Sequence, residues 1–429
     1  MIKKILFLCM MLMILLMPKG PVEAAGITAY EKFISPAYWT EHNADGDKVV
    51  LNAAGEAFNK KIIAASPTVY DMAAYPKTLS GKTVATYVNT HTDLSDELYR
   101  EGKLVSDNYK NILRSQTNAA AIPAEVTVRY GVTVRRANLR NLPTGEGLFF
   151  YAGDRNFDAL QETALDPGEA VAILHTSTNG YFYYVQAYNY RGWLSKFDVA
   201  ETDRSIWLRY AEPKNFLTVV AKDYTLKADG AQVLFQQGAR LQLADKKASA
   251  YTVKVPVRTK EGKLQEEKVV LAANASLHEG YLPYTTNNII RSAFKFYDSV
   301  YGWGGLQQSV DCSSFISNAY RTVGIFLPRN ADEQETSAGI HKKMGNMSSA
   351  QRANVIKGLT PGSTLHMDGH VMLYLGSSNE IPYAIHSLGS HYTGGTRHSV
   401  MKVVVSDLNL QKSNGNTYLD ELTTCVTFR

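Results

Sequence analysis

Short β-prone runs separated by closely spaced turns fill the middle of the chain, and this pattern constrains the fold most. Residues 121–200 include "VTVRYGVTVRR" and "AVAILHTSTNGYFYYVQAYNYRGWL", with Asn-Gly, Pro-Gly and Arg-Gly turns between the strands. Residues 201–278 repeat this texture in "FLTVVAKDYTL" and "ARLQLADKKASAYTVKVPVRT". Because short strands joined by tight turns are typical of small closed sheets, the sequence predicts two small β-barrels in tandem.

Helix-like patterns precede this β-rich region. Residues 25–120 contain "LNAAGEAFNKKIIAA" and "SDELYREGKLVSDNYKNILRSQ", and Leu94, Leu98 and Leu104 fall near helical spacing. We therefore expect an N-terminal helical segment whose amphipathic helices cover another part of the protein. An independent catalytic core is not expected there.

The last part of the chain, residues 279–429, combines helices with strands. A helical stretch, "IIRSAFKFYDSVYG", leads into further helices, and β-prone runs such as "GHVMLYLGS" and "YAIHSLGS" follow. Helices first and an antiparallel sheet afterwards is an α+β order. Since 429 residues also exceed what one hydrophobic core normally supports, the sequence predicts a multidomain α+β protein.

The first 24 residues read as a targeting segment. "MIKK" is followed by the apolar run "ILFLCMMLMILLM", and the small residues Val22 and Ala24 predict cleavage after Ala24. The run is shorter than the roughly 20 residues that span a bilayer, so we expect a secretory signal peptide and no stable membrane insertion. The mature chain would act in the periplasm, in the cell envelope or outside the cell.

Charge and cysteine usage exclude some classes of protein. The net charge of +5 falls to +3 without residues 1–24, which carry three lysines and one glutamate. Such a near-balance gives no sign of nucleic-acid binding. Two cysteines remain, Cys312 and Cys425, too few for small disulfide-stapled domains. A bridge between them stays open, but we expect Cys425 in the core and Cys312 as a free thiol.

Cys312 lies at the start of a predicted helix. Asp311 is a favourable N-cap residue, and Gly324 ends the helical pattern. The apolar positions of this helix recur along one face: Phe315, Ile316, Ala319, Tyr320 and Val323. The free N–H groups and the dipole at the first turn stabilise a thiolate, so we expect the pKa of Cys312 to lie below the free value of about 8.5. This setting favours a nucleophile, and a cysteine that merely fills the core is the alternative.

Two histidines supply the groups that a nucleophilic thiol needs. His370 begins a predicted strand in "HMDGHVMLYLGS", and His386 lies in the next one, "PYAIHSLGS". A hairpin through "SSNEIP" would bring the two strands side by side. A thiol needs a neutral imidazole as base, and that imidazole needs a partner that fixes its tautomer. We therefore expect His370 as base and His386 as orienter, although each histidine alone is more often structural.

Four motifs in order carry a resemblance to a known family. They are "YGWGG", "DCSSFISNAY", "LPRNADEQ" and "GHVMLYLG", all within about residues 285–400. Together they resemble the NlpC-type, papain-like cysteine peptidases of bacterial cell walls. The helical segment and the two barrels resemble a subgroup of these enzymes with tandem bacterial SH3-like domains, in which the first barrel forms one wall of the cleft.

The resemblance implies a catalytic set and a reaction. Cys312 would be the nucleophile, His370 the base, His386 the third member and Tyr301 an oxyanion donor. The reaction would be hydrolysis of the γ-D-glutamyl to diamino acid bond of peptidoglycan stem peptides, most often L-Ala-γ-D-Glu-meso-diaminopimelate, through a thioester. It implies no metal or other cofactor, and we expect a monomer.

The resemblance also bears on substrate binding. Asp311 and Ser313 would hold the ammonium of a free N-terminal L-alanine. Two positions depart from the family pattern: Ser314 replaces a glycine, and Ala331 stands where many relatives have a serine. These departures bear on substrate preference more than on catalysis.

Three other functions remain as alternatives. A zinc hydrolase would use His366 and His370, which are four apart, but no HExxH motif supplies the rest of a site. A non-enzymatic wall-binding protein would act through the barrels alone. A papain-like amidase at the muramyl to L-alanine bond, or an acyltransferase, shares the expected fold.

Overall fold

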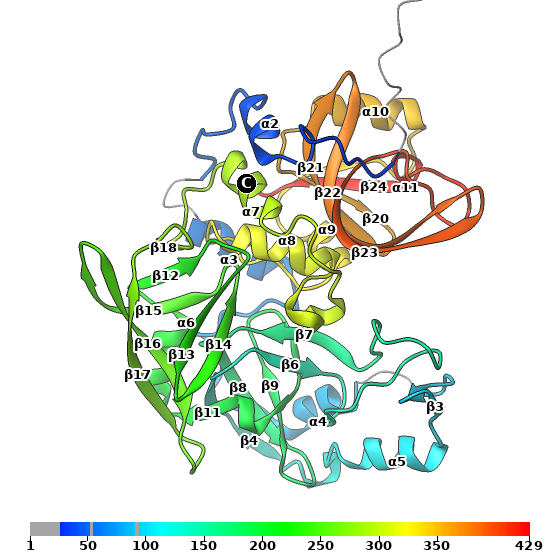
Figure 1. Cartoon of the computed structure of the whole chain (residues 1–429). Helices are drawn as coiled ribbons and strands as arrows, with labels where there is room; N and C mark the ends of the chain where they lie inside the picture. Colours follow the sequence, from blue (N-terminus) through cyan, green and yellow to red (C-terminus); the bar gives the residue numbers. More distant parts are fainter. Residues whose placement is uncertain (1–25, 52–54, 91–93) are drawn as a thin grey trace, which may run out of the picture.

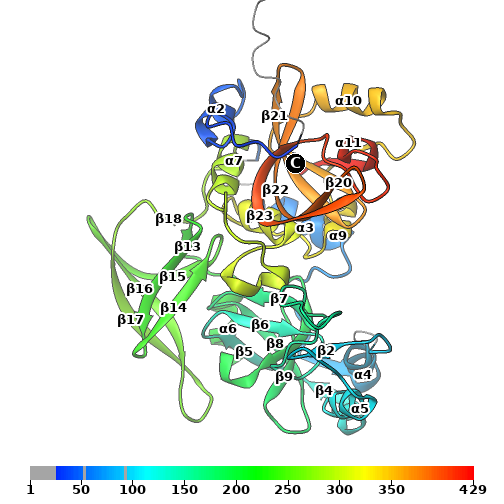
Figure 2. The ribbon, with the colours of Figure 1, turned by 45° about the vertical axis from the view of Figure 1, so that its right-hand side comes forward.

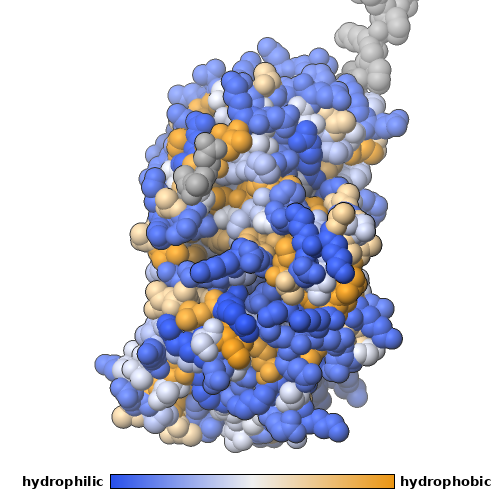
Figure 3. Space-filling model, turned by 90° about the vertical axis from the view of Figure 1, so that its left-hand side faces the viewer, coloured by the Kyte–Doolittle hydropathy of each residue, from blue (hydrophilic) through white to orange (hydrophobic). Residues whose placement is uncertain are grey.

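The computed structural model describes residues 26–51, 55–90 and 94–429, so the predicted signal peptide lies outside the described residues. Figure 1 shows the C-terminal α+β unit above two β-rich units, with parts of the N-terminal segment beside the C-terminal unit and beside the first β-rich unit. Among the described residues no helix has the length and apolar character needed to cross a membrane. Figure 3 shows a largely hydrophilic face, on which apolar side chains form interrupted patches.

The N-terminal segment packs against other parts of the protein. Its helices are α2 (Pro36–Glu41), α3 (Gly55–Ala65), α4 (Gly81–Asn89) and α5 (Asp107–Ser115). Phe33 and Trp39 are buried in the core of the C-terminal unit, whereas Val84 and Val88 share a core with Trp193 of the first β-rich unit. The segment therefore joins two units that lie far apart in the sequence.

The helical spacing expected at Leu94, Leu98 and Leu104 is wrong. Strands β2 (Tyr99–Arg100) and β3 (Lys103–Leu104) form a hairpin there, and Leu104 is exposed. The turn residues Glu101 and Gly102 have φ values of 52° and 78°. Two left-handed residues are the geometry that two-residue hairpins prefer and that a helix excludes.

The first β-rich unit contains the strands that the alternating pattern predicts. They are β5 (Arg129–Thr133), β6 (Ala137–Arg140), β7 (Gln161–Leu165), β8 (Ala170–Thr176), β9 (Phe182–Gln186), β10 (Arg191–Ser195) and β11 (Val199–Thr202). They form one antiparallel sheet in the order β11-β5-β8-β9-β10-β6-β7. Trp193 is fully buried, and helix α6 (Arg204–Ala211) buries Trp207 against the same core.

The second β-rich unit is a five-stranded sheet with a separate hairpin. The sheet has the order β17-β16-β15-β12-β18, and β13 pairs with β14. The bounds are β12 (Phe216–Val219), β13 (Asp223–Ala228), β14 (Ala231–Gln236), β15 (Arg240–Lys247), β16 (Ala250–Arg258), β17 (Leu264–Ala272) and β18 (Leu277–Glu279). Leu217, Phe235 and Val253 are among its buried residues. Strands β16 and β17 pair along their whole length, from Ala250 with Ala272 to Arg258 with Leu264.

The C-terminal unit follows the predicted order of helices before sheet. Helices α7 (Thr286–Phe294), α8 (Cys312–Arg321), α9 (Ala331–Thr336), α10 (Ser349–Lys357) and α11 (Tyr418–Glu421) accompany the short turn η3 (Trp303–Gln308). The strands are β19 (Ile340–Lys343), β20 (Thr364–Met367), β21 (His370–Ser378), β22 (Ile381–Thr393), β23 (Thr396–Asp407) and β24 (Leu422–Thr427), in the order β19-β24-β20-β21-β22-β23. Helix α8 packs on β21 and β22.

The two faces of this sheet are buried differently. Val371, Leu373 and Leu375 of β21 belong to the core shared with α8. Met372 and Tyr374, which alternate with them, belong to a second core with α10 and α11. His370 and Met372 are two residues apart in β21, so their side chains point to the same face of the sheet. His370 therefore lies at the edge of this second face.

Candidate active site

Cys312 occupies the first turn of α8, and Asp311 caps this helix as predicted. The Ser314 N–H donates to Asp311 Oδ1 (2.9 Å), and the Asp311 N–H donates to Ser314 Oγ (3.0 Å). Ser314 therefore closes a capping box that a glycine could not form. Cys312 is partly exposed, Cys425 is buried in β24, and both are free thiols, so the bridge left open by the sequence is not formed.

The strands β21 and β22 bring His370 and His386 together. Leu373 pairs with Ile385 in this hairpin. His370 Nε2 lies 2.8 Å from His386 Nδ1, and His386 Nε2 lies 2.9 Å from Ser406 Oγ. Protonation of both rings at Nε2 satisfies both hydrogen bonds and leaves Nδ1 of His370 as an acceptor. His386 is completely buried, so its ring has a fixed orientation.

Tyr301, Cys312 and His370 line one cavity of about 250 Å³. Tyr301 follows the end of α7, and its ring lies 5.8 Å from the ring of Phe157, which belongs to the first β-rich unit. The Tyr418 ring of α11 lies 6.1 Å from both histidine rings. The cavity therefore combines a thiol, an imidazole and a phenol from three separate segments of the chain.

Burial controls the protonation of this set. Burial, and next the negative charge of Asp311, raises the pKa of Cys312 to about 12, while the N–H groups of Val371 and Ser313 oppose this shift. The lowered pKa expected for a helix N-terminus is wrong here, because desolvation and the capping carboxylate outweigh the helix dipole. Burial, and next the positive charge of Lys412, lowers the pKa of His370 to about 3. The resting pair is a neutral thiol and a neutral imidazole.

Tyr301 is a proton donor at neutral pH. Burial, and next the nearby Cys312, raises the pKa of Tyr301 above its usual range. Its hydroxyl therefore keeps its proton and can donate to a developing negative charge near the sulfur.

Arg329 binds both residues that flank the thiol. Its Nη2 donates to Asp311 Oδ2 (2.5 Å) and its Nη1 donates to Ser313 Oγ (2.8 Å). Burial opposes ionisation of Asp311 most strongly, but Arg329 and the Ser314 N–H together lower the pKa of Asp311. Asp311 and Ser313 are buried and lie outside the cavity lining. Their role toward a substrate ammonium stays a prediction.

The first β-rich unit holds the segments around the thiol. The Trp303 indole donates to the Asp158 carbonyl (3.1 Å), and the Gln161 amide donates to the Gly304 carbonyl (2.8 Å). Gly304 has a φ of 57°, and a Cβ there would lie 2.6 Å from Gln161 Cγ. A glycine is therefore required at this close approach. Figure 2 shows this turn between the C-terminal unit and strands β6 and β7.

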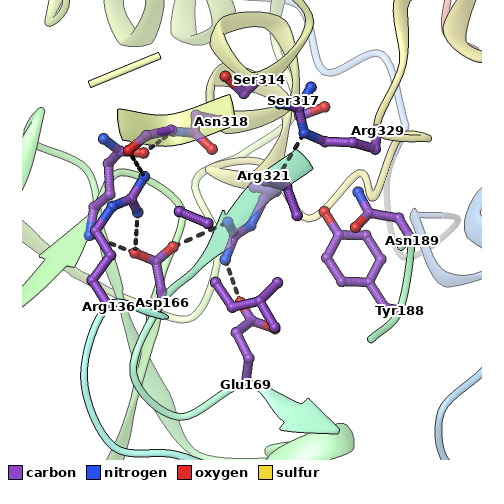
Figure 4. A pocket seen from close by; sticks show the side chains of 15 residues that line it. Arg136, Asp166, Glu169, Tyr188, Asn189, Ser314, Ser317, Asn318, Arg321 and Arg329 are labelled. Carbon is purple, nitrogen blue, oxygen red and sulfur yellow. Dashed lines mark hydrogen bonds and ion pairs between the residues drawn. The ribbon is translucent and has the colours of Figure 1, made fainter. Parts of the chain in front are cut away.

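A buried ion network fixes the other end of α8. Arg321 donates to Asp166 (3.2 Å) and to Glu169 (2.7 Å), and Arg136 donates to the same Asp166 (3.0 Å). Figure 4 shows these groups converging from α8 and the first β-rich unit. Since breaking a buried pair leaves an uncompensated charge, the network favours one placement of α8 on the first β-rich unit.

Sequence reasoning missed three residues of this region. Arg329 was visible only as part of the "LPRNADEQ" motif, and its partners lie in other elements. Asp368 and Lys412 also line the cavity. Asp368 lies within "HMDGH", two residues before His370, so its position in the sequence could have indicated it. No nearby sequence motif connects Lys412 with His370.

The zinc-hydrolase alternative lacks a ligand set. His366 is buried, and its Nε2 is bonded to Thr364 Oγ1 (2.8 Å). In the described part of the chain, no three His, Cys, Asp or Glu side chains gather closely enough to hold a metal ion. A zinc hydrolase needs at least three such ligands.

Comparisons with known proteins match two parts of the chain. Residues 298–404 match the model of the NlpC/P60 family, and residues 148–195 match an SH3 domain of the SH3b1 type. None of the curated proteins matches significantly. These matches confirm the predicted NlpC-type peptidase domain behind an SH3-like domain. They leave the SH3-like character of the second β-rich unit as a prediction.

Two solved structures are similar to this chain at low sequence identity. A structure described as a novel NlpC/P60 endopeptidase from Photobacterium damselae subsp. piscicida has a TM-score of 0.70 and 18% identity, covering 90% of this chain and 94% of that one. An NlpC/P60 family protein from Bacillus cereus ATCC 10987 has a TM-score of 0.49 and 15% identity, covering 70% and 99%. The first similarity extends over all four parts of the chain, which supports the predicted multidomain α+β fold.

Proposed function

Because the chain carries an NlpC/P60 cysteine peptidase domain behind an SH3 domain, we propose that it hydrolyses peptidoglycan stem peptides at the γ-D-glutamyl to diamino acid bond. One observation supports this most: Cys312 and His370 line the same cavity, and His370 is hydrogen-bonded to His386. This is the nucleophile, base and orienter arrangement of acyl-transfer enzymes.

The reaction begins with two neutral groups. The Cys312 thiol passes its proton to Nδ1 of His370 as the sulfur attacks the amide carbonyl. The Tyr301 hydroxyl and the Cys312 backbone N–H donate to the oxyanion that develops there, a contribution typically worth about 2.7 to 4 kcal/mol per donor. The thiol and the imidazole become charged only during the attack. The negative charge therefore moves directly from the sulfur to the carbonyl oxygen, which accepts hydrogen bonds from these two donors.

The intermediate then collapses with the proton on the histidine. His370 gives this proton to the nitrogen of the diamino acid, which leaves as an amine, and an acyl thioester on Cys312 remains. A water molecule loses a proton to His370, attacks the thioester and releases the D-glutamyl γ-carboxylate and the thiol. His386 holds the tautomer of His370 throughout, because its Nδ1 accepts from Nε2 and its own Nε2–H donates to Ser406.

The substrate that we propose is L-Ala-γ-D-Glu-meso-diaminopimelate. Asp311 and Ser313 would hold the ammonium of its free N-terminal L-alanine. The Asp311 carboxylate already accepts from Arg329, Ser314, Gly304 and Ser313. An ammonium would therefore replace one of the weaker of these hydrogen bonds, such as the 3.3 Å bond that Ser313 Oγ donates to Asp311. The wall-related domains suggest that the protein acts outside the cytoplasm, in agreement with the predicted signal peptide.

The bond that is cleaved can be identified directly. The mature protein is incubated with the free tripeptide and with its muramyl-linked form, and the products are analysed by mass spectrometry. Free diaminopimelate together with L-Ala-γ-D-Glu supports the proposal. Release of muramic acid would instead indicate the amidase alternative, and wall binding without any product would indicate a non-enzymatic role.

A further inference from the structure

The candidate catalytic cavity carries two opposite charges near His370. Among the described residues that line it, Asp368 is the one carboxylate and Lys412 is the one primary amine. Asp368 belongs to the turn between β20 and β21, and Lys412 belongs to the loop between β23 and α11. The mechanism proposed above uses neither of them.

Hydrogen bonds hold Lys412 on the rim of the cavity. Its ammonium donates to the Asp368 carbonyl (3.1 Å). Its backbone N–H donates to the Asn416 carbonyl (2.9 Å), and the Tyr392 N–H of β22 donates to the carbonyl of Gln411 beside it (2.9 Å). Since an ammonium has three donors, two further N–H groups can serve a ligand. The lysine is therefore presented by an anchored loop.

Both charges lie on the side of the cavity where the leaving group must be. The imidazole that accepts the thiol proton also returns it to the leaving amine, so this amine lies beside His370. Asp368 precedes His370 by two residues, and the positive charge of Lys412 contributes to the low pKa of His370. The diamino acid therefore leaves from this side, whereas neither Asp311 nor Arg329 lines the cavity.

We propose that Lys412 and Asp368 recognise the side-chain terminus of the leaving diamino acid, Lys412 its carboxylate and Asp368 its ammonium. This inference rests on the proposed function. The three methylenes of diaminopimelate place its distal centre roughly 5 Å from the α-carbon, which is about the length of one and a half residues of extended chain. Lysine carries only the ammonium at this end, so the site distinguishes the two stem types by a carboxylate.

Three tripeptides separate the two contacts. L-Ala-γ-D-Glu-meso-diaminopimelate carries both distal charges, the L-lysine peptide lacks the distal carboxylate, and the L-2-aminopimelate peptide lacks the distal ammonium. All three share the scissile bond and the α-carboxylate. We expect Lys412→Met to raise KM about tenfold for diaminopimelate and aminopimelate and to leave the lysine peptide unchanged. We expect Asp368→Asn to raise KM for diaminopimelate and lysine and to leave aminopimelate unchanged.

Two control variants test whether the effect is specific to the charge at position 412. Lys357→Met removes an exposed lysine of α10 and should change no KM, and Lys412→Arg should keep most of the preference because it keeps the charge. Unchanged KM values for Lys412→Met, or an equal loss on all three peptides, would overturn the inference while wild-type cleavage still supports the proposed function. If the wild-type protein cleaves none of the peptides, the proposed function fails and this inference fails with it.

Discussion

His370 Nε2 and His386 Nδ1 lie 2.8 Å apart across neighbouring strands, and His386 is completely buried. The second ring therefore fixes which nitrogen of the first one can accept a proton. A carboxylate in this place would also stabilise an imidazolium by its charge, whereas a neutral histidine stabilises it by hydrogen bonding alone.

Replacing His386 should lower kcat without a matching change in KM. His386→Ala leaves His370 free to adopt the other tautomer, and we expect kcat to fall by about two orders of magnitude. Ser406→Ala is the matched control: it removes the next partner in the chain and should cost about tenfold or less. Equal activity of His386→Ala and the wild type would show that His370 needs no orienter.

Tyr301→Phe tests the proposed role of Tyr301 as oxyanion donor. The phenol keeps its proton because its pKa is raised by burial, so the change removes one donor and little volume. We expect kcat to fall by about 10² to 10³ with a small change in KM. Phe157→Leu alters the ring beside Tyr301 while keeping the hydroxyl, and it should cost far less. A larger loss in Phe157→Leu would mean that Tyr301 acts through packing.

The buried histidines should make the fold acid-sensitive. The pKa of His370 is lowered to about 3 in the folded state, against about 6.5 in the unfolded chain. Its contribution to stability is fully present above pH 6.5 and is lost as the pH falls toward 3, because the unfolded state binds the proton first. In urea titrations we expect the free energy of unfolding of His370→Gln to fall less than that of the wild type between pH 7 and 5, by about 1 to 2 kcal/mol. Parallel pH profiles would contradict the assignment.

The thiol should react slowly at neutral pH. Since the pKa of Cys312 is raised to about 12, its thiolate is scarce in the resting enzyme. The rate of alkylation by iodoacetamide should therefore rise steadily between pH 7 and 10. Cys425 is buried, so Cys312→Ala should remove the reaction. A plateau already reached at pH 7 would indicate a preformed thiolate and imidazolium pair.

Arg329 should be needed for stability. Its guanidinium compensates the buried Asp311 carboxylate and also donates to Thr163 of the first β-rich unit (2.8 Å). Arg329→Met leaves that carboxylate buried without its cation, and we expect a loss of about 3 to 5 kcal/mol in urea unfolding. Arg329→Met combined with Asp311→Asn should recover part of this loss. No recovery in the double variant would contradict the pairing.

The parts of the fold that depend on local pattern could be predicted from the sequence. Helix α8, its Asp311 cap and its apolar face follow from spacing within a few residues, and so does the hairpin that places His386 beside His370. The helix predicted from the spacing of Leu94, Leu98 and Leu104 was wrong because a hairpin turn forms at Glu101 and Gly102. Propensity alone carries no information about which turn the surrounding structure requires.

The electrostatics of the site could not be predicted in the same way. Helix position alone suggested an acidic thiol at Cys312, but burial and the Asp311 charge raise its pKa. Arg329 and Lys412 act through contacts with residues 18 and 44 positions away. Such partners are set by how the units pack, and a linear pattern cannot show them.

We propose that Cys312 and His370 act together on a stem peptide. The most direct measurement is the rate at which L-Ala-γ-D-Glu-meso-diaminopimelate releases diaminopimelate with the wild type, Cys312→Ala and His370→Ala, each shown to be folded by circular dichroism. We predict release by the wild type and none above background by either variant. Release by Cys312→Ala at the wild-type rate would show that Cys312 is not the nucleophile.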